Sequence, residues 1–311
     1  MTGPSEVTPE DIVLAAARLS GLVRRTPLLD VSQPTQALGP GGPIFLKLES
    51  MQRSGSFKLR GALNAALTLD PRPTALVTAS GGNHGAGLAC AGAQVGLPVE
   101  VYVPKSTPPD KRARLVRLGA RVHVTGEVWD DADAAAREAT AAGEGAYVHP
   151  FADPAVIAGN GTVALEILAD LPDVACVVIA VGGGGLIGGC ARAIKAARPE
   201  AKVIGVEPRG APTLSQSLAA NALVTLPEIT TRAGSLAPRR SAELNLKLAR
   251  QFVDEVVLVS DEELEAGVAW LRSELGVAAE LGGAASLAAV LSGRFVPPRE
   301  GPTCLVICGA G

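Results

Sequence analysis

The feature that most constrains the fold is a regular alternation between short apolar runs and longer stretches of helical character. In the first half, strands are predicted at 75–78, 99–103 and 121–124 and helices at 84–95, 110–118 and 129–142. In the second half, strands are predicted at 176–181, 203–206, 256–259 and 304–307 and helices at 158–171 and 187–197. Strands and helices in regular succession indicate parallel sheets with helices on their faces. The sequence therefore predicts an α/β fold, and its 311 residues are enough for two lobes.

Composition argues against several classes of partner. With 28 lysines and arginines against 31 aspartates and glutamates, the net charge of -3 gives no general attraction to nucleic acid or to an anionic membrane. No apolar run approaches the roughly 18 residues of a membrane span, and residues 1–10 lack the basic and apolar segments of a signal peptide. The five cysteines form no CxxC pair, which argues for a reducing compartment. We therefore predict a cytoplasmic protein that binds neither nucleic acid nor membrane.

One lysine, Lys58, stands in unusual surroundings. Gly55 and Ser56 before it suit a turn that leads into a helix. Phe57 and Leu59 flank it with apolar surface, which can desolvate the amine. Most lysines stay charged and solvated, but a desolvated lysine is a better nucleophile and base. Lys58 is therefore the first candidate for a catalytic group.

Four consecutive glycines, residues 182–185, follow a predicted buried strand and precede a predicted helix. Glycines let the backbone approach an anion closely, and the N–H groups at the start of a helix donate to it. A plain strand-to-helix turn and a dinucleotide site are the alternatives. The spacing is not GxGxxG, and Glu207 is followed by a proline rather than standing at a plain strand end. We favour a site for a single phosphate monoester.

A second turn between a predicted strand and a predicted helix reads Ser80-Gly81-Gly82-Asn83-His84. Such a turn can bind a carboxylate through its serine, its backbone N–H groups and the helix start, and an asparagine amide can donate to a hydroxyl. Taken alone, it reads as an ordinary turn in which the asparagine adopts a positive φ.

Together these segments resemble the pyridoxal-phosphate-dependent serine/threonine dehydratases and serine racemases, a family with the tryptophan-synthase-β type of fold, known as fold type II. The segment 54–62 resembles that family's cofactor-lysine motif. The order of lysine motif, asparagine loop, glycine loop and C-terminal strand is reproduced over nearly the whole chain. The resemblance implies two lobes, each a mainly parallel twisted sheet flanked by helices, with pyridoxal 5'-phosphate between them. The large lobe would comprise residues 1–72 and 152–311, and the small lobe, with the asparagine loop, residues 73–151.

The resemblance also implies a role for each segment. Lys58 would hold the cofactor as an imine and, once the substrate amine displaces it, would act as general base at the α-carbon. The implied cofactor-binding residues are Lys58, Phe57, Asn83, Gly182, Gly183, Gly184, Gly185, Leu186 and Cys308. The implied substrate-binding residues, which take the carboxylate, are Ser80, Gly81, Gly82, Asn83 and His84. Asn83 would face the phenolic oxygen and Cys308 the pyridine nitrogen, where a thiol leaves the ring a weaker electron sink than a carboxylate would.

The implied reaction is β-elimination of water from L-threonine, L-serine or both, which yields a 2-oxo acid and ammonia. The alternatives are a serine racemase, a dehydratase of the 3-hydroxyaspartate type, and a homologue that binds the cofactor without catalysis. A nicotinamide-dependent oxidoreductase is a more distant alternative. The family also leads us to expect a homodimer. Because the chain ends soon after Cys308, the resemblance is to a catalytic domain only, and we expect no regulatory domain after it.

Three places in the sequence depart from the family's pattern. Glu207 matches one carboxylate ligand of the family's cation site, but Thr213 stands where an aspartate is expected, and the tripeptide 233–235, Ala-Gly-Ser, replaces the usual Ala-Asp-Gly. Hard cations prefer several oxygen ligands, including carboxylates, so we predict no strong dependence on magnesium or calcium. The segment 280–284, Glu-Leu-Gly-Gly-Ala, departs from the usual Glu-Pro-x-Gly-Ala, and we expect the substrate pocket near it to differ.

Gly81 separates dehydratase from racemase chemistry. Racemisation needs a second acid or base on the opposite face of the α-carbon, and the racemases that this chain resembles carry a serine where it has Gly81. Glycine has no side chain that could transfer a proton. On this basis the substitution Gly81→Ser should create measurable interconversion of L- and D-serine, and rapid interconversion by the wild-type protein would contradict the assignment.

Overall fold

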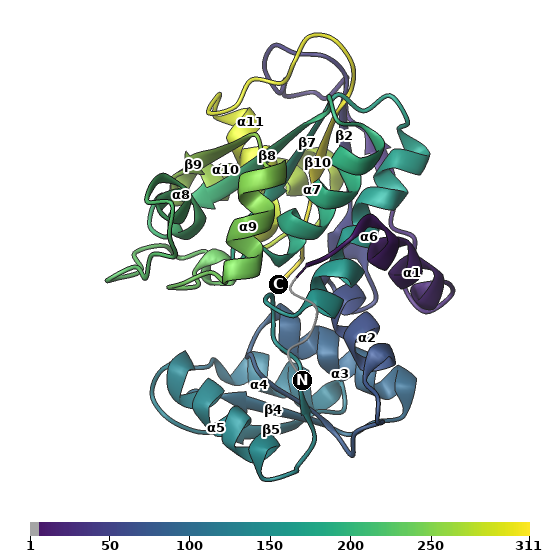
Figure 1. Cartoon of the computed structure of the whole chain (residues 1–311). Helices are drawn as coiled ribbons and strands as arrows, with labels where there is room; N and C mark the ends of the chain where they lie inside the picture. Colours follow the sequence, from purple (N-terminus) through teal and green to yellow (C-terminus); the bar gives the residue numbers. More distant parts are fainter. Residues whose placement is uncertain (1–5) are drawn as a thin grey trace.

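Two separate sheets of mainly parallel strands organise the computed structural model of the protein, which describes residues 6–311 (Figure 1). The predicted α/β architecture is confirmed. Residues 1–5, which belong to the predicted large lobe and to the N-terminal stretch assessed for a signal peptide, lie outside the described residues.

The larger sheet has six strands in the spatial order β1-β2-β10-β7-β8-β9. Their bounds are β1 Leu28–Asp30, β2 Ile44–Lys47, β7 Cys176–Ala180, β8 Lys202–Pro208, β9 Glu255–Val259 and β10 Thr303–Val306. Only the edge strand β1 is antiparallel to its neighbour. Every residue of the central strands β7 and β10 is buried. Their continuous apolar sequences therefore reflect a sheet that is covered on both faces.

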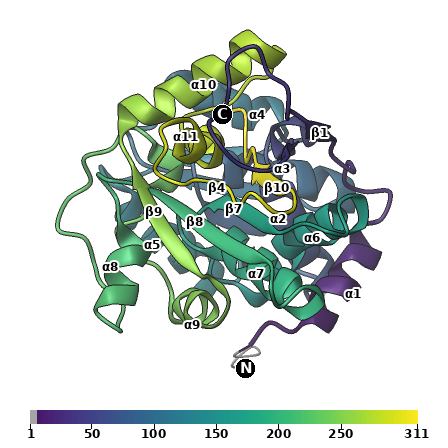
Figure 2. The same cartoon turned by 90° about the horizontal axis from the view of Figure 1, so that it is seen from above.

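Helices cover both faces of this sheet (Figure 2). α10 (Asp261–Leu275) and α11 (Ala285–Leu291) lie over one face, and α6 (Pro154–Asp170), α7 (Gly185–Ala197) and α9 (Glu243–Phe252) lie over the other. The remaining helical elements of this part are α1 Pro9–Leu19, α8 Thr213–Ala219 and the 3-10 turns η1 Glu49–Met51, η2 Gly234–Leu236 and η3 Gly282–Ala284. Within residues 6–311, no helix is both long and apolar enough to cross a membrane.

The smaller sheet has four parallel strands in the order β5-β4-β3-β6. The strands are β3 Leu76–Ala79, β4 Val99–Val103, β5 Arg121–Val124 and β6 Ala146–Tyr147, with the helices α3 Asn83–Val95, α4 Pro109–Arg117 and α5 Trp129–Ala141 between them. α5 packs against β3 through Ala132 and Ala136, which share a small apolar cluster with Val77 and Ala79. α3 supplies Leu88 and α4 supplies Leu115 to a separate core.

Helix α2 (Lys58–Thr68) lies between the two sheets and packs on α3 and on α6. Its apolar residues Leu59 and Leu63 belong to the same core as Leu76 and Leu88 of the smaller sheet and its helix. Against α6 its backbone comes so close that a Cβ on Gly61 would lie 2.6 Å from a backbone oxygen. The lobe boundaries predicted at 72/73 and 151/152 stay a prediction.

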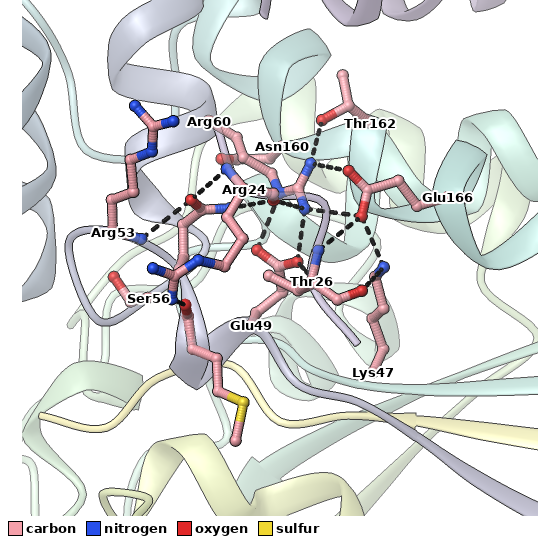
Figure 3. A network of polar contacts seen from close by, with 12 residues as sticks. Arg24, Thr26, Lys47, Glu49, Arg53, Ser56, Arg60, Asn160, Thr162 and Glu166 are labelled. Atoms are coloured by element: carbon pink, nitrogen blue, oxygen red, sulfur yellow. Dashed lines mark hydrogen bonds and ion pairs between the residues drawn. The ribbon is translucent and has the colours of Figure 1, made fainter. Parts of the chain in front are cut away.

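A buried network of charges fixes the start of α2 (Figure 3). Arg60 donates to both oxygens of Glu49, at 2.8 and 2.7 Å, and to both oxygens of Glu166, at 2.7 and 3.0 Å. Lys47 donates to Glu166 at 2.6 Å and to the carbonyl of Thr26 at 2.8 Å. Glu49 also accepts from the Thr26 hydroxyl at 2.5 Å. Two cations and two carboxylates thus balance one another at the junction of β2, η1, α2 and α6.

Burial and ion pairing shift the pKa values of Arg60 and Glu166 in opposite directions. Burial alone would lower the pKa of Arg60, but Glu49 and Glu166 raise it well above its ordinary value. Burial alone would raise the pKa of Glu166, but hydrogen bonds and charges from Arg60 and Lys47 outweigh it, and the pKa is lowered. Arg60 and Glu166 therefore stay ionised at neutral pH, and each lies beside a partner of opposite charge.

Substitution of Arg60 tests the cost of breaking this network. Arg60→Met leaves Glu49 and Glu166 buried without their main cation, so the free energy of unfolding should fall by about 3–5 kcal/mol in urea denaturation. Arg121→Met removes an arginine that is 76% exposed beside Glu100 and serves as the matched control. Its effect should stay within about 0.5 kcal/mol. If both variants lost the same free energy of unfolding, the buried network would not be what stabilises the start of α2.

Candidate functional site

Lys58 is the first residue of α2, and the segment before it pairs with the segment after β10. Ser56 forms an isolated antiparallel bridge with Gly309. The backbone N–H of Phe57 donates to the carbonyl of Cys308 at 3.1 Å. Two segments that are far apart in the sequence, the lysine motif and the C-terminal motif, therefore lie side by side at the carboxyl end of the central strands.

The Lys58 amine is half-buried and donates to the carbonyl of Pro150 at 2.6 Å. It lies 5.1 Å from the centre of the Phe57 ring. Burial lowers the pKa of Lys58 to about 8, although Cys308 and Glu280 act in the opposite direction. A substantial fraction of the amine is therefore neutral near pH 8, as a nucleophile or a general base requires.

The asparagine loop runs from β3 into α3, and Asn83 is the first residue of that helix. The Asn83 amide donates to Glu280 at 2.5 Å. A Cβ on Gly309 would lie 3.2 Å from the Asn83 amide nitrogen and 3.5 Å from a Glu280 oxygen. The loop thus meets the C-terminal segment. In the same loop the Ser80 hydroxyl accepts from the N–H of Gly82 at 3.4 Å.

The contact between Glu280 and Asn83 is one that the sequence did not indicate. Glu280 belongs to the segment that departs from the family's pattern, and the glycine pair of that segment allows a close approach. A Cβ on Gly283 would lie 2.1 Å from the carbonyl oxygen of Gly309, so only a glycine fits there. In the sequence, the two glycines indicate that another segment packs closely against this one. They do not indicate that the segment is the one with Gly309, or that Asn83 contacts Glu280.

His84 is buried, and its Nε2 lies 3.1 Å from the carbonyl of Val148. Since a carbonyl only accepts, Nε2 carries the proton and Nδ1 is the acceptor. Nδ1 is buried and has no partner among the described residues. Burial and the charge of Lys58 lower the pKa of His84 to about 3, so the ring is neutral at physiological pH.

The glycine loop joins β7 to α7, and Gly182 and Gly184 have φ values of 54° and 92°. These lie in the left-handed region, where glycine carries no steric penalty. α7 begins at Gly185, so the N–H groups of its first turn, which include Leu186, have no partner within the helix. They point out of the helix start, as an anion site requires.

Three side chains that the sequence did not indicate border this loop. Asn245 and Ser241 donate to the carbonyl of Gly183 at 2.6 and 3.0 Å. A Cβ on Gly183 would lie 2.3 Å from the ring of Phe151, so no other residue fits at this position. Phe151 follows Pro150, which accepts from Lys58, and this segment therefore connects the lysine to the glycine loop.

His149 holds that segment in place. Its Nδ1 accepts from the N–H groups of Phe151 and Ala152 at 3.2 and 2.9 Å. Burial, with the charge of Arg137, lowers the pKa of His149 to about 4. The ring is therefore neutral at physiological pH and acts here as a hydrogen-bond acceptor for the backbone.

Cys308 is 6% exposed, and its thiol donates weakly to the carbonyl of Val306 at 3.5 Å. Burial raises the pKa of the Cys308 thiol to about 12. The thiol therefore stays protonated and neutral. It is suited to a neutral contact with a ligand rather than to nucleophilic attack.

Glu207 follows Val206 of β8, whose carbonyl accepts from the N–H of Val181 at 3.0 Å just before the glycine loop, and both Glu207 oxygens have partners. They accept from the N–H groups of Leu214 and Ser215 at 2.8 and 2.9 Å, at the start of α8. Within residues 6–311, no group of three or more histidines, cysteines or acidic residues is arranged to hold a metal ion. A cation role for Glu207 stays a prediction.

The structure thus gathers Lys58, Asn83, Cys308 and the glycine loop around one region between the two sheets. The connections run from the lysine to Pro150 and Phe151, and from Asn83 to Glu280 and Gly309. Such a set can bind an anion, form a bond from a neutral amine and move a proton at that amine.

Comparisons with known proteins agree with this arrangement. The family described as pyridoxal-phosphate dependent enzyme matches residues 19–309. An L-threonine ammonia-lyase of Geobacter sulfurreducens is 41% identical over 295 residues, which cover 94% of this chain and 72% of the relative. The solved structure of maize serine racemase has a TM-score of 0.92 at 30% identity and covers 98% of this chain and 93% of its own. A solved threonine deaminase from T.th. has a TM-score of 0.90 at 35% identity, with 98% of both chains covered.

The lowered pKa of Lys58 is testable without any ligand. When the protein is treated with formaldehyde and cyanoborohydride at a series of pH values, methylation of Lys58 should rise with a midpoint near pH 8, because only the neutral amine reacts. An ordinary lysine, with a pKa of about 10.4, is below about 1% neutral at that pH. Peptide mass spectrometry measures the labelling, and Lys58→Ala identifies the peptide. A midpoint above about pH 10, the value of an ordinary lysine, would contradict the assignment.

Proposed function

The chain belongs to the family of pyridoxal-phosphate-dependent enzymes, and on that premise we propose that it removes ammonia from L-threonine, L-serine or both. The reaction is β-elimination of water, with a 2-oxo acid as the other product. The observation that carries the proposal is the half-buried Lys58 amine, with a pKa lowered to about 8, between the glycine loop and the C-terminal segment. The names of the relatives, L-threonine ammonia-lyase and threonine deaminase, support this choice of reaction.

The residues around Lys58 fit pyridoxal phosphate. The glycine loop offers the N–H groups of a helix start and carries no side chain that could obstruct a phosphate. The Ser56 hydroxyl and the Asn245 amide oxygen are buried and have no partner among the described residues, so polar groups remain to be satisfied beside the lysine and the loop. The cofactor fits the remaining donors as well, since Asn83 offers an amide and Cys308 a neutral thiol.

Each segment then has a role in holding the cofactor. Gly182–Gly185 and Leu186 would hold the phosphate, Phe57 would border the ring beside Lys58, and Asn83 would donate to the phenolic oxygen. Cys308 would face the ring nitrogen and, as a neutral thiol, would give it no full proton. When bound, the cofactor supplies an aldehyde that captures amines and a ring that stabilises negative charge at the α-carbon.

The chain's own groups handle the substrate. Residues Ser80 to His84 bind the carboxylate through the serine hydroxyl and the N–H groups at the start of α3. Lys58, as a neutral amine, takes the α-proton as general base. The neutral ring of His84 donates from Nε2 to the carbonyl of Val148. This hydrogen bond holds the loop against the segment that follows β6. Because Gly81 has no side chain, the loop brings no second base to the opposite face, and elimination is favoured over racemisation.

The cellular location and the assembly of the protein form a further part of the proposal. We place it in the cytoplasm because all five cysteines are free thiols. We propose a homodimer of subunits with a large lobe of residues 1–72 and 152–311 and a small lobe of residues 73–151. Sedimentation velocity measures the state of assembly directly.

The test combines a spectrum with a product assay. The purified protein loaded with pyridoxal phosphate should show an absorption band near the visible edge, which borohydride removes while labelling Lys58. NMR should then show 2-oxobutyrate from L-threonine or pyruvate from L-serine. D-serine and 3-hydroxyaspartate are tested in parallel, and a clear preference for either of them would contradict the substrate assignment.

Lys58→Ala should abolish both the band and turnover, because it removes the amine that binds the aldehyde and takes the α-proton. The loss in kcat should be at least about a thousandfold. Lys247→Ala, which changes an exposed lysine paired with Glu6, is the matched control and should retain both. Retention of either property by Lys58→Ala would refute the mechanism.

A further inference from the structure

Thr107 occupies the space beside Gly81. A Cβ placed on Gly81 would lie 2.7 Å from the methyl carbon Cγ2 of Thr107 and 3.1 Å from its hydroxyl oxygen. Real Cβ atoms essentially never come as close as 2.7 Å to another heavy atom. The Cβ of Thr107 itself lies at 3.6 Å, an ordinary contact. The conflict therefore comes from the two branches of the threonine and not from its backbone.

Rotation of the Thr107 side chain does not remove the conflict. A side chain has three staggered positions around χ1, and a β-branched residue fills two of them with heavy atoms. Two of the three positions face Gly81, so every rotamer leaves at least one heavy atom there. In the most favourable rotamer that atom takes the place of the present hydroxyl oxygen, 3.1 Å from the Cβ, which is still a tight contact. Thr107 is 8% exposed, which further restricts its movement.

The backbone that carries Thr107 is anchored as well. Thr107 lies between β4 and α4, and its N–H donates to the carbonyl of Pro104 at 3.0 Å. The backbone N–H of Lys105 donates to the carbonyl of Gly126 at 3.0 Å. Prolines 104 and 108 flank the segment and restrict its φ angles. The backbone of the segment is thus tied at Thr107 to its own turn and at Lys105 to Gly126.

We propose that Thr107 is a specificity-determining residue, which keeps any side chain out of position 81 and so keeps the opposite face of the α-carbon free of an acid. This inference rests on the proposed function. Racemisation breaks the α-carbon–hydrogen bond by transfer of the proton to Lys58 and forms a new bond on the other face with a proton from a second group. That group is then reprotonated by water as Lys58 releases its proton to water. Thr107 excludes the side chain that would serve as this group.

The proposal changes the expected result of Gly81→Ser. The single substitution places a Cβ against Thr107 and should yield a strained protein rather than a racemase. Thr107→Ala retains only the Cβ at 3.6 Å and makes room for a serine. Thr107→Val keeps both branches without the hydroxyl and is the matched control, because it tests shape alone.

The first measurement is thermal unfolding of the protein without cofactor or substrate. Gly81→Ser should lower Tm by about 3–6 °C in the wild-type background and in the Thr107→Val background. In the Thr107→Ala background the same substitution should lower Tm by less than about 1 °C. An equal loss in all three backgrounds would overturn the packing on which the proposal depends.

The second measurement is the rate of D-serine formation from L-serine, by chiral chromatography, with the cofactor-loaded variants. The double variant Gly81→Ser/Thr107→Ala should exceed Gly81→Ser alone, Gly81→Ser/Thr107→Val and the wild type by at least about tenfold. Equal rates in the two double variants would overturn the role of Thr107. If the wild type deaminates neither L-threonine nor L-serine, the proposed function fails, and the specificity role fails with it even where the Tm pattern holds.

Discussion

The contact between Arg60 and the carboxylates of Glu49 and Glu166 is the constraint on which the arrangement of the site depends. It joins the larger sheet, through Lys47 of β2, to α6 and to the first turn of α2. Well-packed apolar residues of the same volume often match or exceed the stability of such a buried network. What the charges add is direction, because a bidentate guanidinium pair fixes both position and orientation. Lys58 precedes Arg60 by two positions, so the network fixes the backbone that carries the Lys58 amine within a single helical turn.

Burial shifts the pKa values of the site residues toward their uncharged forms. It lowers the pKa values of Lys58, His84 and His149, and it raises that of the Cys308 thiol. All four shifts favour the uncharged form of the group. An anionic ligand would therefore meet backbone N–H groups, the neutral side chains of His84, His149 and Cys308, and the Lys58 amine there. The side chain of Glu280 also borders this region, and the Asn83 amide donates to it.

The sequence allowed the prediction of parts whose signal is local. The apolar runs of β7 and β10, the glycine loop and the lysine motif are contiguous, and the backbone rules of strands and helix starts act on neighbouring residues. The network around Arg60 could not be predicted, because its members are spread from Thr26 to Glu166 and charged residues are rarely fully buried. The partners of Thr107 and Glu280 escaped for the same reason, since each residue meets its partner only through folding.

The pairing of Gly81 with Thr107 also has a consequence for how related activities can arise. Because Thr107 fills the space beside Gly81, the loss of stability depends on which of the two positions is substituted first. Enlarging position 81 first produces an overpacked intermediate, whereas shrinking Thr107 first leaves a small gap that a marginally stable protein tolerates more readily. Starting from this framework, a side chain at position 81 is therefore reached at lower cost through a smaller residue at 107 first.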